Sequence, residues 1–313
     1  MEYLTRRGPV RAVEDVSFTL NAGEVVGLAG ESGSGKSTIA HALLRILPPP
    51  ALITGGQVLF GEQDVLQMDM AALEQFRWDS ISIVFQSAMN ALNPVMRIRD
   101  QLLDVMQHHG LSSAEANRRA VHLFDLVGIE TQRLEAYPHQ LSGGMRQRAV
   151  IAIALALDPP LLIMDEPTTA LDVVVQKDIL QQIASLRDKL GFSILFITHD
   201  LSLLVEMSDK IAIMYAGEIV EQAPARELFE SPLHPYTCGL MNSFPSVTGM
   251  KHKLTGIPGS PPDLVEPPAG CRFHPRCPKA MPKCSTEAAA IKSISPTHSV
   301  VCHLYEQSLP VLP

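Results

Sequence analysis

The chain has 313 residues, of which 46% are hydrophobic and 19% charged, a composition typical of a soluble globular protein with one large or two moderate domains. Its net charge of −8 and its short, scattered arginine runs disfavour a phosphate-backbone binder, so no nucleic-acid partner is expected. The longest apolar run is too short to span a bilayer and the N-terminus lacks the apolar core of a secretory signal, which predicts a cytosolic protein.

Apolar segments alternate with helical patterns over the first 230 residues, which predicts a largely parallel sheet of the α/β class. Four segments have the composition of buried strands: residues 24–30, 81–86, 161–165 and 193–198. Helices are expected over residues 37–47, before a run of prolines, and over residues 177–190, where Gly191 is the predicted C-cap. Residues 100–157 contain no convincing strand and predict a helical insert.

The composition changes after about residue 233, where proline and glycine become frequent and periodicity fades. This change predicts a linker that leads to a small, loop-rich C-terminal module.

Residues 30–37, GESGSGKS, satisfy the phosphate-loop pattern G-x(4)-G-K-[ST] between a predicted strand and a predicted helix. Glycines let successive N–H groups point at phosphate oxygens, and the helix N-terminus adds partial positive charge. Lys36 is expected to neutralise the β/γ-phosphates and the Ser37 hydroxyl to ligate Mg²⁺. The alternative is a glycine- and serine-rich loop that matches by chance. The expected ATP contacts are Gly30, Ser32, Gly33, Ser34, Gly35, Lys36, Ser37 and Thr38.

Two acids end the third predicted strand, residues 161–165. Such acids lie at the carboxyl edge of a parallel sheet, where ligands bind. Asp165 is expected to hold Mg²⁺, and Glu166 to orient or deprotonate the attacking water. The alternative is an ordinary strand end with solvated acids.

Three further features are weak when each is taken alone. Ser142, Gly143 and Gly144 open a predicted helix, as an anion-binding start or as a plain N-cap. Gln86 and His199 each follow a predicted strand, where a histidine is usually structural.

The order of these motifs resembles the ATP-binding cassette (ABC) family of ATPases over about residues 3–230. The resemblance implies that Gln86 senses Mg²⁺ and meets a membrane partner, and that Ser142–Gly144 closes on the ATP of a second cassette. It also implies that Asp172 links the two ATP sites across the cassette pair and that His199 is a switch histidine. Tyr3 stands about where the family places an aromatic residue that stacks on adenine; only two residues precede it, so the usual leading strand is expected to be missing or shortened.

Four segments resemble one branch of that family, the oligopeptide/dipeptide/nickel importers: residues 86–94, 137–148, 232–237 and 270–277. The resemblance implies an ATPase subunit at the cytoplasmic face of the plasma membrane that powers import of di- or oligopeptides, or of nickel or oligosaccharides. The implied partners are two permease subunits, a second ATPase chain, commonly a different one, and an extracytoplasmic binding protein. The expected domains are 1–232, with a helical subdomain at about 87–157, and a C-terminal extension at 233–313.

Four of the five cysteines, Cys271, Cys277, Cys284 and Cys302, lie in this extension. Four thiolates suit Zn²⁺ or an iron–sulfur cluster, and the short cysteine pairs of zinc knuckles are absent. Similar cysteines in some members of the branch hold a [4Fe–4S] cluster, which is favoured here over zinc; free thiols are the third possibility. Cys238 is expected to be a packing residue.

Two other functions are consistent with a cassette. An ATPase acting on nucleic acid usually carries coiled-coil or zinc insertions, which this chain lacks, and its net charge is negative. A regulator that binds ATP without cleaving it is disfavoured because Glu166 and His199 are both present. Transport is therefore the expected function.

Overall fold

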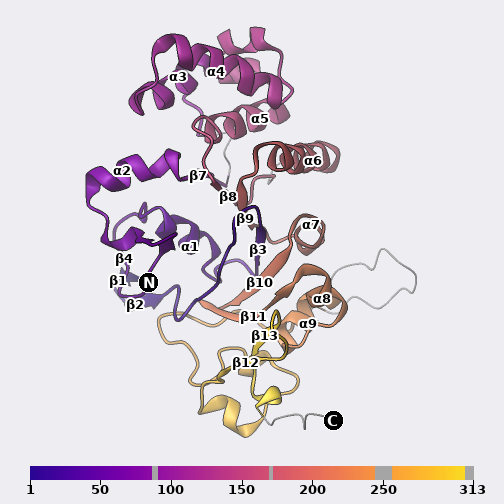
Figure 1. The fold of residues 1–313 in the computed structure, drawn as a ribbon. Coiled ribbons are helices and arrows are strands. Elements are labelled where there is room, and N and C mark those ends of the chain that lie inside the picture. The colour runs from indigo at the N-terminus through magenta and orange to yellow at the C-terminus, as the bar shows by residue number, and fades with distance from the viewer. Residues whose placement is uncertain (87–90, 169–171, 244–255, 307–313) are drawn as a thin grey trace. The chain divides into compact units, whose positions relative to one another are not determined.

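A computed structural model describes residues 1–86, 91–168, 172–243 and 256–306 (Figure 1). The chain divides into two compact units. Unit 1 comprises Met1–Thr19, Val26–Val58 and Thr198–Pro313, and unit 2 comprises Leu20–Val25 and Leu59–Ile197. Both units combine helices with sheet strands, so the expected α/β class is confirmed. No helix among the described residues is long and apolar enough to cross a membrane.

The main sheet of unit 1 has the strand order β12-β13-β11-β10-β3. Strand β3 (Val25–Ala29) is buried throughout and pairs in parallel with β10 (Lys210–Tyr215). Strand β11 (Glu218–Pro224) pairs antiparallel with β10 and with β13 (Ser299–Val301), which pairs with β12 (Ile291–Ser293). The C-terminal hairpin therefore extends the sheet that contains β3, and is joined to it by backbone hydrogen bonds.

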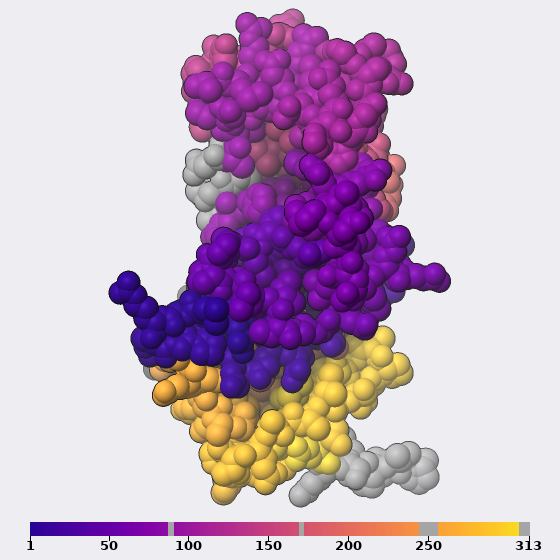
Figure 2. Space-filling model, turned by 90° about the vertical axis from the view of Figure 1, so that its left-hand side faces the viewer, coloured from indigo at the N-terminus to yellow at the C-terminus, as the bar shows by residue number. Residues whose placement is uncertain are grey.

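A second, antiparallel sheet of unit 1 has the order β2-β1-β4, with β1 at Glu2–Thr5, β2 at Gly8–Arg11 and β4 at Ala51–Leu52. Arg11 N–H donates to the Leu264 carbonyl, and Figure 2 shows the indigo N-terminal residues beside the yellow-orange C-terminal ones. The helices of unit 1 are α1 (Lys36–Leu43), α7 (Leu201–Met207), α8 (Ala225–Glu230) and α9 (Pro235–Asn242). Short 3-10 helices η5 (His274–Arg276), η6 (Pro282–Ser285) and η7 (His303–Tyr305) confirm the loop-rich character of the C-terminal residues.

Aromatic packing joins the C-terminal residues to strand β10. The rings of Tyr215, Tyr236 and Phe273 lie 4.6 to 5.3 Å apart between centroids, and all three side chains are almost completely buried. Buried aromatic groups of this size contribute strongly to a core. His298, 2% exposed, adds a polar link, since its two ring nitrogens lie 2.8 and 2.9 Å from carboxylate oxygens of Glu221 and Glu227.

Unit 2 contains three parallel strands in the order β9-β8-β7, at Ser193–Ile197, Leu161–Asp165 and Ile81–Val84. Their near-continuous apolar sequences are typical of a parallel sheet covered on both faces. Helix α2 (Met70–Asp79) packs against β7, and α6 (Val173–Leu190) follows β8 in the chain. A hairpin of β5 (Leu59–Phe60) and β6 (Gln63–Asp64) leads through η1 (Val65–Gln67) into α2.

The expected helical insert is confirmed. It consists of α3 (Ile98–His108), α4 (Ser113–Leu126), η3 (Thr131–Glu135), η4 (Pro138–Gln140) and α5 (Gly143–Ala154), without a strand among its described residues (Figure 1). Ser112 begins α4 with a capping box, because its hydroxyl accepts the Glu115 N–H while the Glu115 carboxylate accepts the Ser112 N–H.

Two predicted helix bounds were wrong. Helix α1 ends at Leu43 rather than at residue 47, since Arg45 takes a left-handed φ of 50° two residues later. Helix α6 begins at Val173 rather than at residue 177, because the Asp172 carboxylate accepts the Val175 N–H and caps it there. Its C-terminus at Gly191, with φ of 76°, is as predicted.

Candidate functional site

The phosphate-loop residues connect β3 to α1 within unit 1. Gly30, Gly33 and Gly35 all take left-handed φ angles, of 149°, 79° and 103°. A Cβ on Gly30 would lie 2.1 Å from the Met214 carbonyl oxygen, and one on Gly35 would lie 2.3 Å from the Ala12 carbonyl oxygen. Glycine is therefore required at both positions, for conformation and for space.

The Lys36 side chain lies inside the loop. Its Nζ donates to the carbonyl oxygens of Gly30 at 2.8 Å and Glu31 at 2.9 Å, and the residue is only 6% exposed. Lys36 also begins α1, so its ammonium charge and the helix N-terminus act at one place. Ser32 and Gly33 are exposed, Ser34 is buried, and Ser37 and Thr38 are half-buried in the first turn of α1. The loop thus combines a cation with helix N–H groups, which is a donor set that fits a polyphosphate.

Tyr3 lies in β1 and is half-buried, and its Oη is 3.4 Å from the Thr38 hydroxyl oxygen. Strand β1 has four residues. Tyr3 is thereby placed beside the helix that follows the phosphate loop.

The acidic strand end lies in unit 2. Asp165 is the buried last residue of β8, and Glu166 turns sharply away from the strand with a left-handed φ of 48° while its N–H donates to the Ile197 carbonyl. Gln86, which follows β7, donates from Nε2 to Glu166 Oε2 over 2.8 Å. Two residues expected to act in the same reaction are therefore brought into contact.

Ser142, Gly144 and Asp172 occupy two helix starts of unit 2. The Ser142 hydroxyl accepts the Met145 N–H and caps α5, so Ser142 acts as an N-cap in this structure. A Cβ on Gly144 would lie 3.0 Å from Val175 Cγ1, so the first turns of α5 and α6 pack closely. Ser142 and Asp172 are exposed, and Gly143 and Gly144 are half-buried.

His199 follows β9 and is exposed; it belongs to unit 1, like the phosphate loop. Residues 87–90, which belong to the segment 86–94 quoted above, lie outside the described residues, as do residues 169–171 before Asp172.

The four clustered cysteines lie near one another in the C-terminal residues. Cys271 N–H donates to the Cys284 carbonyl, and burial together with the neighbouring thiols raises the pKa of Cys271 to about 11. Burial also raises the pKa values of Cys277 and Cys302. No group of three or more histidine, cysteine or acidic side chains among the described residues is arranged to hold a metal ion. Cys238 is not one of these four, and its Sγ donates a hydrogen bond to the Pro232 carbonyl oxygen.

Three residues that contact or belong to the phosphate loop were not predicted from the sequence. Glu31 lies within the loop, and Arg276 and Tyr236 bind it from segments whose family pattern was noted without a role for either side chain. No local signal could have found the Arg276 contact, because the two residues are 245 positions apart.

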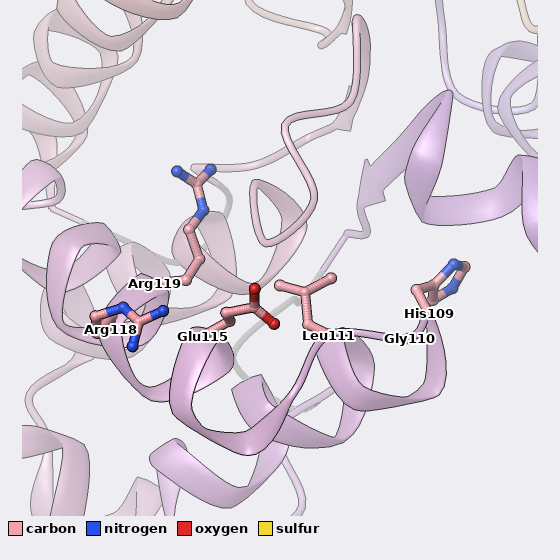
Figure 3. A pocket seen from close by; sticks show the side chains of 6 residues that line it. All are labelled: His109, Gly110, Leu111, Glu115, Arg118 and Arg119. Carbon is pink, nitrogen blue, oxygen red and sulfur yellow. The ribbon is translucent and has the colours of Figure 1, made fainter.

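A pocket of about 640 Å³ lies on the helical insert, lined by His109, Gly110, Leu111, Glu115, Arg118 and Arg119 (Figure 3). It is an open depression in which two charged groups, those of Arg119 and Glu115, have structural partners. Arg119 donates to the Leu155 and Ala156 carbonyls, and Glu115 belongs to the capping box of α4. The pocket contains none of the expected nucleotide residues.

Comparisons with known proteins agree with this architecture. Residues 13–169 match the family model described as ABC transporter, and residues 220–284 match the oligopeptide/dipeptide transporter C-terminal region. The dipeptide transport ATP-binding protein DppD of Caldanaerobacter subterraneus subsp. tengcongensis is 42% identical over 312 residues, covering 99% of this chain and 96% of that protein. The oligopeptide transport ATP-binding protein OppD of Salmonella typhimurium is 44% identical over 303 residues, covering 96% and 90%.

A solved structure is also similar. The dimeric post-hydrolysis state of the ATP-binding cassette MJ0796, bound to ADP and Pi, is 29% identical with a TM-score of 0.63, and the match covers 72% of this chain and 95% of that one. The chain therefore belongs to the ABC transporter ATPases. Within them it belongs to the group that carries the C-terminal region of oligopeptide/dipeptide transporters.

Proposed function

We propose that this chain binds Mg-ATP at residues 30–38 and hydrolyses it to power an importer of di- or oligopeptides. The observation that carries the catalytic part is the contact of Gln86 Nε2 with Glu166 Oε2, because it holds a carboxylate at the end of a buried parallel strand. Residues 1–232 form the nucleotide-binding domain in this proposal, with the helical subdomain at about 87–157, and residues 233–313 form the extension.

The proposed roles follow the chemistry of phosphoryl transfer, which depends on positioning and charge neutralisation. Lys36 and the start of α1 bind the phosphates, and Tyr3 packs against adenine. Ser37, Asp165 and Gln86 hold Mg²⁺, an ion that favours oxygen ligands and neutralises charge developing on the phosphates. Glu166 orients the attacking water, and His199 contacts the γ-phosphate.

The same proposal includes a second ATPase chain. Ser142, Gly143, Gly144 and Asp172 face the nucleotide of that chain. The support is their position at two closely packed helix starts, next to Val173 and Val174, which are 78% and 71% exposed although apolar. Exposed apolar groups of this kind are typical of an interface. Two permease subunits attach the pair to the cytoplasmic face of the membrane, and an extracytoplasmic binding protein delivers the substrate.

Peptide is the proposed substrate class because the relatives named above are dipeptide and oligopeptide transport proteins. Nickel or oligosaccharides are the alternative cargo, with the same ATPase role. Uptake of labelled peptides, nickel and sugars by vesicles containing the purified complex separates these cases.

We also propose that Cys271, Cys277, Cys284 and Cys302 hold a [4Fe–4S] cluster rather than Zn²⁺. Four thiols of one small module support it, since each thiolate would bind iron of the cluster. Iron analysis and visible absorbance of anaerobically purified protein test the proposal; a colourless sample with one zinc per chain contradicts it.

Glu166→Gln tests the catalytic proposal in the assembled complex. The neutral amide preserves shape but cannot accept a proton, so ATP binding should persist while turnover is lost and closed pairs accumulate. Unchanged hydrolysis would show that another group orients the water.

A further inference from the structure

Glu31, an unassigned position of the phosphate loop, is held through each of its polar groups. Its N–H donates to Tyr236 Oη over 2.8 Å, and its carbonyl accepts from Lys36 Nζ over 2.9 Å. Its carboxylate oxygens accept from the two Nη atoms of Arg276, at 2.7 and 3.0 Å. The contacts on the N–H and on the carboxylate both come from C-terminal segments, at residues 232–237 and 270–277.

The Arg276 guanidinium is restrained by further contacts with Pro258 and Tyr215. Its Nε donates to the Pro258 carbonyl over 2.8 Å, its Nη1 lies 3.3 Å from Tyr215 Oη, and its Cζ is 5.7 Å from the centroid of the Tyr215 ring. The side chain is 6% exposed and its Glu31 partner 25%. A forked pair with this little exposure is screened weakly by solvent and is stronger than a surface pair.

The two-pronged ion pair between the Arg276 guanidinium and the Glu31 carboxylate, called the fork below, also affects the net charge at the loop. Glu31 places a carboxylate in the segment that must accept a polyphosphate, and like charges in a partly buried site repel. Arg276 neutralises this carboxylate and, through it, restrains the backbone between Gly30 and Ser34. Arg276 directly precedes Cys277 in the chain, so the residue that holds the loop belongs to the segment that carries the cysteines.

We propose that Arg276 is a positioning residue of the nucleotide site, which acts through Glu31 to set the affinity of the phosphate loop for Mg-ATP from the cysteine-bearing segment. This inference rests on the proposed function of the loop. The C-terminal extension is then a scaffold of the nucleotide site, in addition to any role of its thiols.

The test is a double-mutant cycle on the full-length chain, with Mg-ATP affinity measured by calorimetry. Arg276→Gln leaves the Glu31 carboxylate without its fork and should weaken Mg-ATP binding about tenfold or more. In a Glu31→Gln background the same change should cost far less, because the carboxylate to be neutralised is gone. Costs that simply add, or an unchanged affinity in Arg276→Gln, would overturn the proposal.

Two controls separate a positioning effect from general damage. Arg7→Gln removes another arginine–carboxylate pair to the C-terminal residues, the exposed pair with Asp263, and should leave affinity unchanged. Arg276→Lys keeps the charge without the fork and should restore part of the affinity; if Arg276→Gln does not fold, Arg276→Lys in the two Glu31 backgrounds gives the same cycle. A loss of affinity in Lys36→Ala but in no Arg276 variant would refute this inference alone, whereas normal affinity in Lys36→Ala would refute the proposed function.

Discussion

Gln86 Nε2 donates a hydrogen bond to Glu166 Oε2 over 2.8 Å, although 80 residues separate the two in the chain. The contact forms because β7 and β8 are parallel neighbours, with Val84 opposite Met164, so the residues that follow the two strands emerge at the same edge. A carboxylate held in this way has fewer orientations open to it.

Replacing Gln86 by leucine should lower ATP turnover about tenfold, because the Glu166 carboxylate loses its donor and spends less time in the productive orientation. The unfolding temperature should change little, since Gln86 is exposed. Steady-state hydrolysis in the assembled complex measures the effect. Gln86→Glu, which opposes two carboxylates, should be at least as slow; full activity in both variants would mean that the contact has no catalytic part.

Lys36→Ala should weaken Mg-ATP binding by about tenfold to a hundredfold, because a nearly buried ammonium group is removed from the phosphate loop. Titration calorimetry of the isolated chain measures it. The exposed Lys189 at the end of α6 is the matched control, and Lys189→Ala should bind Mg-ATP as the parent does. Equal affinities in all three proteins would place the nucleotide elsewhere.

Gly35→Ala should destabilise the fold by about 2 kcal/mol or more, through its left-handed backbone and a Cβ 2.3 Å from the Ala12 carbonyl oxygen. Gly33→Ala has the same backbone cost but meets no atom within 4 Å, so about 1 kcal/mol is expected. Denaturant titrations of the two variants measure the difference. Equal losses would mean that the Ala12 backbone moves aside without cost.

Acid should destabilise the protein through His234. Burial lowers the pKa of His234 from 6.5 to about 4, and its Nδ1 accepts the Tyr236 N–H, which requires the neutral ring. The unfolded chain therefore binds the proton at a higher pH than the folded chain does. The contribution of neutral His234 to the free energy of unfolding is complete above about pH 6.5 and falls towards pH 4, by about 3 kcal/mol in total.

The measurement is the free energy of unfolding against pH in the parent protein and in His234→Asn. Asparagine also caps helices but does not titrate, so the variant should show a shallower slope between pH 6.5 and 4. Identical slopes would mean that other groups account for the acid sensitivity.

Strands β3, β7, β8 and β9 were predicted because each is a short, predominantly apolar run. Strands β10 and β11, at Lys210–Tyr215 and Glu218–Pro224, were not predicted. The start of α6 was missed because three consecutive valines disfavour a helix, whereas the Asp172 cap and packing overrode that preference.

The sequence by itself determined the phosphate loop, the acidic strand end, the helical insert and the family, because each depends on residues close together in the chain or on a familiar order of motifs. Only the tertiary structure brought Gln86 to Glu166 and Arg276 to Glu31, and joined the C-terminal hairpin to the sheet of β3. Those contacts depend on strand pairing and burial between distant segments. Local propensity does not constrain these contacts, so they could not be predicted from any single segment of the sequence.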